Sequence, residues 1–323
     1  MKHRFIHSLL ALGIALATSA AVAADAFPSH PIRIVVNTAP GGLTDITTRL
    51  VAQKMSENLG QSVIVENRAG GDGLIGIRAV KQARADGYTL LGTASTIAIQ
   101  PAVKLDPGYD LLKDFTGVGP MSQSPLLIVE ATSQSDKTLG DLMARVKANP
   151  NKLTYASAGV GTTTHLAAAL FLQESGLKMM HVPYKGNGAA FPDVLSGRVT
   201  IIFDAYGSSA AQVKGGKLRA LAVTSKKRLS AMPEMPTVAE QGIPNYSYEL
   251  WLGIVAPAGT PKDVVQRLSQ ALHSATSSKE VQERLHEWGS EPMQQTPEEF
   301  TQLLRADLAR YSKLVADLSI PKQ

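Results

Sequence analysis

The chain of 323 residues contains no cysteine. This absence excludes disulfide bonds, a thiol nucleophile and a metal site built from thiolates, so a fold of this length must rest on its hydrophobic core. Hydrophobic residues make up 44% of the chain and charged residues 18%, which is typical of a globular protein rather than a disordered one. No block of like charges and no basic stretch interleaved with aromatics occurs, which argues against a nucleic-acid partner.

The sequence also has little that could span a membrane, and its N-terminal apolar stretch is short. A basic start (MKHR) is followed by the apolar stretch LLALGIALA and by the small residues AVA at 21–23. A membrane-spanning helix needs roughly 20 apolar residues, so a secretory signal peptide over residues 1–23 is favoured over a membrane anchor. Cleavage there would remove Lys2 and Arg4 and lower the formal charge from +5 to +3.

Motifs for catalysis and for metal or nucleotide binding are absent or incomplete. Ser95 and Ser157 lack the G-x-S-x-G frame of a nucleophile elbow, and no G-K-[ST] follows a glycine-rich loop. Among the five histidines that lie after the predicted signal peptide, no two have the i,i+4 spacing of a metal site. GDGLIG (71–76) matches the dinucleotide fingerprint, but no strand directly precedes it, so we interpret its glycines as turn and packing residues. His165 is expected to be hydrogen-bonded within the structure rather than to a ligand. We predict no enzyme activity, metal or cofactor.

Short apolar runs alternate with amphipathic patterns along the chain. Strands are expected over 32–37, 63–65, 88–91, 125–129, 153–157, 180–184, 200–203 and 218–223. Helices are expected over 44–58, 73–85, 138–149 and 163–175. Strands that alternate with helices are typical of parallel sheets in an α/β fold.

Three loops follow predicted strands, at 38–45, 93–96 and 158–164, which is where ligands bind in such sheets. The first contains APGGLTD and the third lies within ASAGVGTTTH. Glycines let backbone N–H groups turn toward a ligand, threonine hydroxyls add donors, and the field of a following helix favours anions. Thr162 and Thr163 could also simply cap that helix, and the two roles are compatible.

Two acidic residues and one tryptophan need separate interpretation. Asp45 could be a helix-start acid favoured by the helix dipole or a pocket residue, and the sequence leaves both open. Asp204 ends the apolar run 201–203 at the ligand-binding edge of a sheet, which favours a functional role. Trp251 is expected in the core rather than against a ligand.

Several separate motifs carry a family resemblance. In chain order they are PGGLTD (40–45) with Arg49 after it, ENRAG (66–70), DGYTL (86–90), YASAGVGTTTH (155–165), VPYKG (182–186), GKLRALAV (216–223), PTVAEQG (236–242) and WLGIVAPAGTP (251–261). Together, over about residues 31–311, the chain resembles Bug-type extracytoplasmic solute receptors, the solute-binding components of tripartite tricarboxylate transporters.

This resemblance implies a two-domain Venus-flytrap fold of periplasmic binding proteins, with mostly parallel sheets and two crossing segments. Domain 1 would take residues 27–122 and 227–323, and domain 2 would take residues 123–226. The protein would be a monomeric periplasmic receptor that carries its ligand unchanged and presents it to a membrane transporter or a sensor.

The ligands implied by the resemblance are small carboxylates, including dicarboxylates, amino acids and aromatic acids. The first and third loops would hold the carboxylate with backbone N–H groups, hydroxyls and water, often without an arginine. Leu43 departs from the small residue frequent at its position, and could narrow the pocket or cover an apolar part of the ligand. The residues assigned to the site are Thr38, Pro40, Gly41, Gly42, Leu43, Thr44, Asp45, Thr93, Ser95, Ala158, Gly159, Gly161, Thr162, Thr163 and Asp204.

Three other functions remain open at this point. The sequence does not distinguish a receptor that signals to a partner from a receptor that serves transport. A secreted hydrolase would need Ser95 or Ser157 beside His165, with an acid behind the ring. A purely structural module would gain no thermal stability from any small acid.

Overall fold

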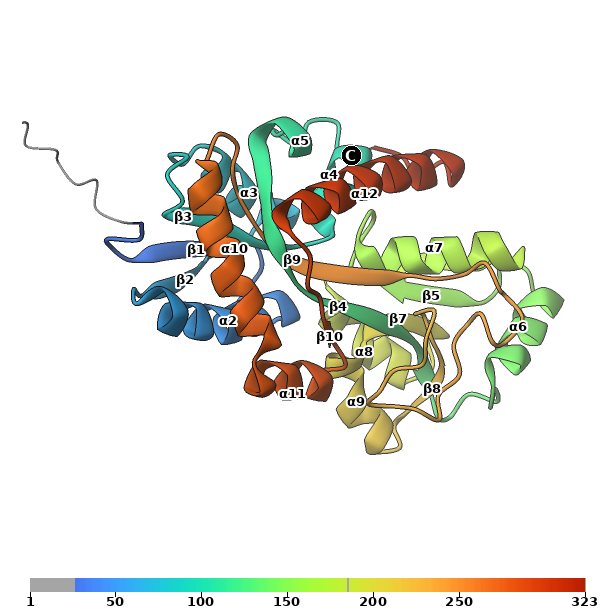
Figure 1. Cartoon of the computed structure of the whole chain (residues 1–323). Helices are drawn as coiled ribbons and strands as arrows, with labels where there is room; N and C mark the ends of the chain where they lie inside the picture. Colours follow the sequence, from blue (N-terminus) through green and yellow to red (C-terminus); the bar gives the residue numbers. More distant parts are fainter. Residues whose placement is uncertain (1–26, 185, 323) are drawn as a thin grey trace, which may run out of the picture.

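A computed structural model of the chain describes residues 27–184 and 186–322 (Figure 1). The predicted signal peptide lies outside the described residues. Among the helices that the structure describes, none is long and apolar enough to cross a bilayer.

The first half of the molecule is a parallel sheet with helices after its strands. The central strand β1 pairs with β2 on one side and with β3 on the other, both in parallel. The elements are β1 (Ile32–Val36), α2 (Leu43–Leu59), β2 (Val63–Asn67), the 3-10 turn η1 (Gly71–Gly73), α3 (Leu74–Lys81), β3 (Thr89–Ala94), α4 (Thr96–Val103) and α5 (Leu111–Asp114). Gly60 ends α2 in the left-handed conformation, as its position after the helical pattern predicts.

Two long strands carry the chain between the halves. β4 (Phe115–Ala131) leaves the first half and continues into the second, while β9 (Glu249–Pro257) runs antiparallel beside it on the return. All antiparallel pairs of the sheet involve β4 or β9. The strand order is β2-β1-β3-β9-β4-β7-β5-β6, with β8 and β10 also pairing with β4. The expected α/β fold with two crossing segments is confirmed.

The second half repeats the alternation of strands and helices. Its parallel strands β6, β5 and β7 lie side by side, and β7 and β8 each pair antiparallel with the far end of β4. The elements are α6 (Leu139–Ala148), β5 (Thr154–Ser157), α7 (Thr163–Ser175), β6 (Met180–Pro183), α8 (Asn187–Leu195), β7 (Ile201–Ala205), α9 (Tyr206–Lys214) and β8 (Leu218–Val223). α6 begins with a capping box, in which the side chains of Thr138 and Asp141 are each bonded to the other residue's backbone.

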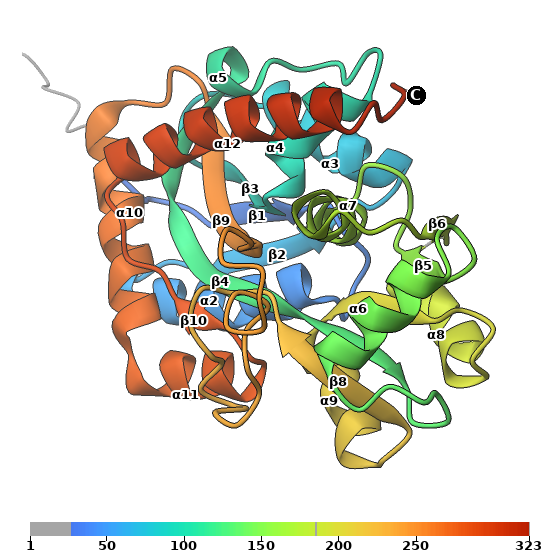
Figure 2. The ribbon, with the colours of Figure 1, turned by 90° about the vertical axis from the view of Figure 1, so that its right-hand side faces the viewer.

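The C-terminal helices return to the first half (Figure 2). α10 packs against α2, and α12 packs against α4 while also contacting α7 of the second half. These elements are α10 (Lys262–Ser277), α11 (Lys279–Glu287), β10 (Glu291–Pro292) and α12 (Pro297–Asp317).

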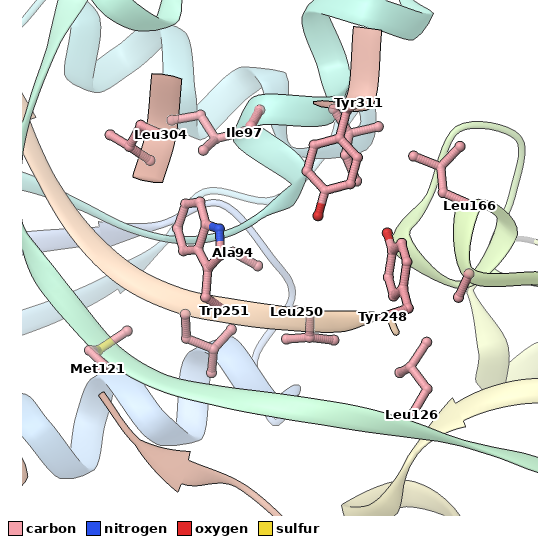
Figure 3. Close-up of a cluster of buried hydrophobic side chains, with 14 of the residues drawn as sticks. Ala94, Ile97, Met121, Leu126, Leu166, Tyr248, Leu250, Trp251, Leu304 and Tyr311 are labelled. Carbon is pink, nitrogen blue, oxygen red and sulfur yellow. The ribbon is translucent and has the colours of Figure 1, made fainter. Parts of the chain in front are cut away.

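Large aromatic side chains fill the junction beside β9 (Figure 3). Trp251 is 4% exposed, as expected for a core residue, and its indole N–H donates to Asp307 over 2.7 Å. The hydroxyls of Tyr248 and Tyr311 point toward one another in Figure 3. Tyr246 donates its hydroxyl to the carbonyl of Ala167 in α7 over 3.1 Å, so the crossing region also fixes a helix of the second half.

Candidate ligand-binding site

The first glycine-rich loop joins β1 to α2. Gly41 has φ +81°, a conformation that glycine adopts without strain, and Gly42 is the extended N-cap of α2. No side chain caps the first turn of this helix. Its N–H groups therefore form a positive end toward which an anion can be drawn.

Asp45 closes this loop from the first turn of α2. One carboxylate oxygen accepts the N–H of Gly41 over 2.9 Å, and the other accepts Arg49 over 3.0 Å and Asn67 over 2.9 Å. Burial raises the pKa of Asp45, but these hydrogen bonds outweigh it and hold the pKa below its usual value. The structure thus places Asp45 as a helix-start acid with both oxygens engaged inside its own half.

Asn67 also supports the first loop, and it was not predicted from the sequence as a site residue. We call the hydrogen-bonded group of Asp45, Arg49 and Asn67 the brace of this loop. It donates to the carbonyl of Thr38 over 3.1 Å as well as to Asp45, and it accepts from Arg49 over 2.7 Å. It belongs to the ENRAG motif, so the family resemblance contained a signal for it. Its role depends on the parallel pairing of β1 with β2, which sets Val36 opposite Asn67.

Hydroxyls without partners gather at the carboxyl ends of β1 and β3. Within the described part of the chain, Oγ1 of Thr38 and Oγ of Ser95 are buried and form no hydrogen bond of normal geometry, although the hydroxyl of Tyr311 lies near that of Ser95. The backbone N–H of Ser95 donates to the carbonyl of Trp251 over 3.0 Å. Thr93, the third polar residue assigned here, is fully buried in β3. A buried hydroxyl left unpaired is costly, so both free hydroxyls are suited to a ligand that can bond to them.

The remaining first-loop residues differ in exposure. Pro40, Gly41 and Gly42 are exposed, while Thr44 is buried. Leu43 is half-buried and packs against the hydrophobic core. The backbone of the loop is therefore accessible to solvent at its outer side, and Leu43 is the only large apolar side chain that the loop contributes.

The second glycine-rich loop joins β5 to α7. Gly159 and Gly161 have φ values of +135° and +73°. Thr162 is the N-cap of α7, accepting the N–H of His165 over 3.4 Å and donating to the carbonyl of Gly159 over 2.8 Å. Thr163 is the first residue of the helix. The capping interpretation therefore holds for Thr162.

Ala158 and Gly161 tie this loop to its surroundings. The N–H of Ala158 donates to Oγ1 of Thr164 over 3.0 Å. A Cβ on Gly161 would lie 2.7 Å from a methyl group of Val103, at the end of α4 in the first half. This close approach requires glycine and brings the second loop against the other half of the molecule.

Asp204 is bonded within the second half. One oxygen accepts Asn187 over 2.6 Å, and the other accepts Ser209 over 2.5 Å and also Ser208. Asn187 in turn lies 3.4 Å from the hydroxyl of Thr164. Asp204 therefore supports the start of α8 and α9, and reaches the second loop only through Asn187.

The histidines near this loop do not form a hydrolase triad. Ser157 lies 2.6 Å from Nε2 of His181 rather than beside His165, which accepts the N–H of Gly161. No carboxylate in the described ranges forms a hydrogen bond or ion pair with either imidazole. No group of three or more acidic, histidine or cysteine residues in that part of the chain could hold a metal ion.

Comparison with known proteins identifies the family. The model of the tripartite tricarboxylate transporter family receptor matches residues 47–320. The chain belongs to this receptor family. BugT of Bordetella pertussis is 33% identical to the receptor over 314 residues, 96% of each chain.

Solved structures extend the likeness to three dimensions. The structure of R. palustris Rpa4515 with adipate has a TM-score of 0.84 and 32% identity, covering 92% of the receptor and 100% of the other chain. The structure of MatC (Rpa3494) from Rhodopseudomonas palustris with bound malate has a TM-score of 0.78 and 28% identity, covering 90% and 100%. The matched family is one of receptors, and so this member of the family is a receptor rather than an enzyme.

Proposed function

We propose that this receptor captures a small dicarboxylate in the periplasm and presents it to a membrane transporter. The observation that carries the proposal is the uncapped start of α2 beside the unpartnered hydroxyls of Thr38 and Ser95. These groups can donate to a carboxylate, and fixed donors replace its lost water with little reorganisation. Adipate and malate in the two solved relatives support a dicarboxylate over an amino acid or an aromatic acid.

The acidic residues of the site are already hydrogen-bonded within the protein and are compatible with an anionic ligand. Asp45 and Asp204 are 3% exposed, and each uses both of its carboxylate oxygens inside the protein. Arg49 offsets the charge of Asp45, and three neutral donors stabilise the charge of Asp204. These contacts reduce the repulsion that the carboxylate of a ligand would meet.

We assign the two loops to different domains, with residues 27–122 and 227–323 in one and residues 123–226 in the other. The parallel pairs β2-β1-β3 and β6-β5-β7 fall on opposite sides of this division, which supports it. A ligand that contacts both loops stabilises the closed form over the open one, because only closure supplies both sets of contacts. The receptor would work as a monomer.

Calorimetry and thermal shift on the protein purified from the periplasm test the proposal. We expect malate or adipate to raise Tm in a concentration-dependent way, while adipamide, which has no charge, should not. Glutamate and benzoate test the two other ligand classes. If none of the four acids binds, the proposal is wrong. Mass spectrometry of the same sample tests cleavage near Ala23.

A pair of variants tests the placement of the ligand. Thr38→Val with Ser95→Ala removes the two unpartnered hydroxyls, so we expect unchanged or higher stability but about tenfold weaker dicarboxylate binding. Ser274→Ala, an exposed hydroxyl on α10, is the matched control. Unchanged affinity in the double variant would place the carboxylate elsewhere.

A further inference from the structure

Three aromatic rings from three different elements stack behind the second glycine-rich loop. The imidazoles of His165 in α7 and His181 in β6 are 4.1 Å apart at an interplanar angle of 7°. Tyr155 in β5 continues the stack, 4.8 Å from His181 at 14°. His165 is 7% exposed, and Tyr155 is 5% exposed. The carrier function does not by itself require two stacked imidazoles here.

Each imidazole is tied to a glycine of the loop. The N–H of Gly161 donates to Nδ1 of His165 over 3.0 Å. On the other ring, Nε2 of His181 lies 2.6 Å from Oγ of Ser157, which accepts the N–H of Gly159 over 3.1 Å. The pair thus fixes the orientation of two backbone N–H groups in the loop, one directly and one through Ser157.

The bond from Gly161 defines the charge state of His165. A backbone N–H can only donate, so Nδ1 must be unprotonated and a neutral ring must carry its proton on Nε2. Protonation would set an N–H on Nδ1 against the N–H of Gly161, and the hydrogen bond would be lost. Protonation of both rings is further opposed, because two cations would then be stacked face to face.

None of the charged or titratable groups that the structure describes around the two rings favours a charged pair. Tyr155 stays neutral, since burial raises its pKa to about 12. Asp204 reaches the loop only through the side chain of Asn187, and Lys104, next to Val103 against which the loop packs, is paired with Asp72 over 2.6 Å. The pKa of His181 is lowered to about 4 by burial, and the pKa of His165 is lowered to about 4 by burial together with the charge of His181.

We propose that His165 and His181 are positioning residues of the receptor. As a neutral stacked pair they hold the backbone of the loop at Gly159 and Gly161 in its binding conformation, and protonation of His165 releases the loop together with its ligand. This rests on the proposed function, because it assigns the loop to carboxylate binding. The tie between the imidazoles and the loop is a property of the ligand-free protein and can be tested separately.

Nuclear magnetic resonance of ligand-free protein with 15N-labelled histidine tests that tie. We expect His165 to be the Nε2–H tautomer at pH 7 and to stay neutral well below pH 6. The Gly161 amide should exchange slowly until His165 protonates and quickly afterwards. An Nδ1–H tautomer at pH 7, or titration of His165 near pH 6.5, would overturn the proposal whether or not any acid binds.

Binding of adipate by two His165 variants tests the consequence. His165→Asn keeps an acceptor near the position of Nδ1 and cannot take a proton, whereas His165→Phe keeps a ring without an acceptor. At pH 7 we expect His165→Asn to bind within about threefold of wild type and His165→Phe at least about tenfold more weakly. His273→Asn, at an exposed histidine of α10, is the matched control.

The pH profile separates a positioning role from a merely structural one. The ratio of wild-type to His165→Asn affinity cancels the protonation of adipate itself, and it should fall as pH drops from 6 to 4. A constant ratio, or wild-type affinity in His165→Phe, would contradict the proposal. If adipate does not bind wild type, malate replaces it. If neither binds, the proposed function fails, and the tautomer and exchange measurements still decide whether the imidazoles hold the loop.

Discussion

The carboxylate of Asp45 accepts the backbone N–H of Gly41 over 2.9 Å, so the first loop is closed by the helix that follows it. The second loop is closed by the same spacing of four residues, but there the acceptor is the imidazole of His165 for the N–H of Gly161. The two hydrogen bonds that close the loops respond differently to acid. Hydrogen bonds hold the pKa of Asp45 below its usual value, whereas His165 loses its acceptor on protonation.

Asp45→Ala should weaken dicarboxylate binding by about tenfold, because it frees the N–H of Gly41 and leaves Asn67 and Arg49 without their shared acceptor. Calorimetric titration measures the change. Glu57→Ala removes an exposed acid from the same helix and should leave affinity unchanged. Wild-type affinity in Asp45→Ala would show that this brace does not shape the site.

Local sequence patterns predicted strands and helices between residues 32 and 223, but they predicted no element after residue 223 and only part of β4. The apolar run 125–129 predicts five residues of a strand that in fact covers Phe115–Ala131. Its first part contains Gly117, Gly119 and Pro120, which disfavour a strand locally. Pairing with β9 overrides that preference, and register shifts at these positions absorb the irregularity.

At the site, too, features set by the local sequence were predicted, whereas contacts set by the tertiary structure were not. Glycines after strands indicated both loops, because that signal is local. Asn67, His181 and Asn187 act on those loops from neighbouring strands and helices, and only the sheet order brings them there. His165 was correctly expected to bond within the structure, but its stacking on His181 depends on tertiary structure, because α7 packs against β5 and β7 and β6 pairs beside β5.

Gly161→Ala should lower both stability and affinity. The new Cβ would lie 2.7 Å from Val103, and φ is +73°. Gly216→Ala isolates the backbone contribution, since φ there is +68° and no heavy atom lies within 4 Å. We expect about 1 kcal/mol of destabilisation in Gly216→Ala and at least about 1 kcal/mol more in Gly161→Ala by urea denaturation. Equal losses would mean that Val103 moves aside freely.

Asp307→Ala should destabilise the junction by about 1–3 kcal/mol, because the buried indole N–H of Trp251 loses its acceptor. Asp317→Ala is the control on the same helix. Asp317 pairs with Lys313 at the surface, so its removal should cost less than about 0.5 kcal/mol. Equal free energies of unfolding for the two variants would contradict this account.

Acid should destabilise the fold through the imidazole pair. The pKa of His165 and of His181 is about 4 in the folded protein, below the ordinary value of 6.5, so the unfolded chain binds more protons between these pH values. The contribution of the neutral imidazoles to the free energy of unfolding is therefore fully present above about pH 6.5 and falls toward pH 4. Each histidine can lower the free energy of unfolding by at most about 1.4 kcal/mol per pH unit, and the half-buried His181 by less. Urea denaturation between pH 7.5 and 4.5 measures this slope, which should be shallower in His165→Asn with His181→Gln, because neither side chain titrates there. The same slope in wild type and double variant would show that other groups carry the acid sensitivity.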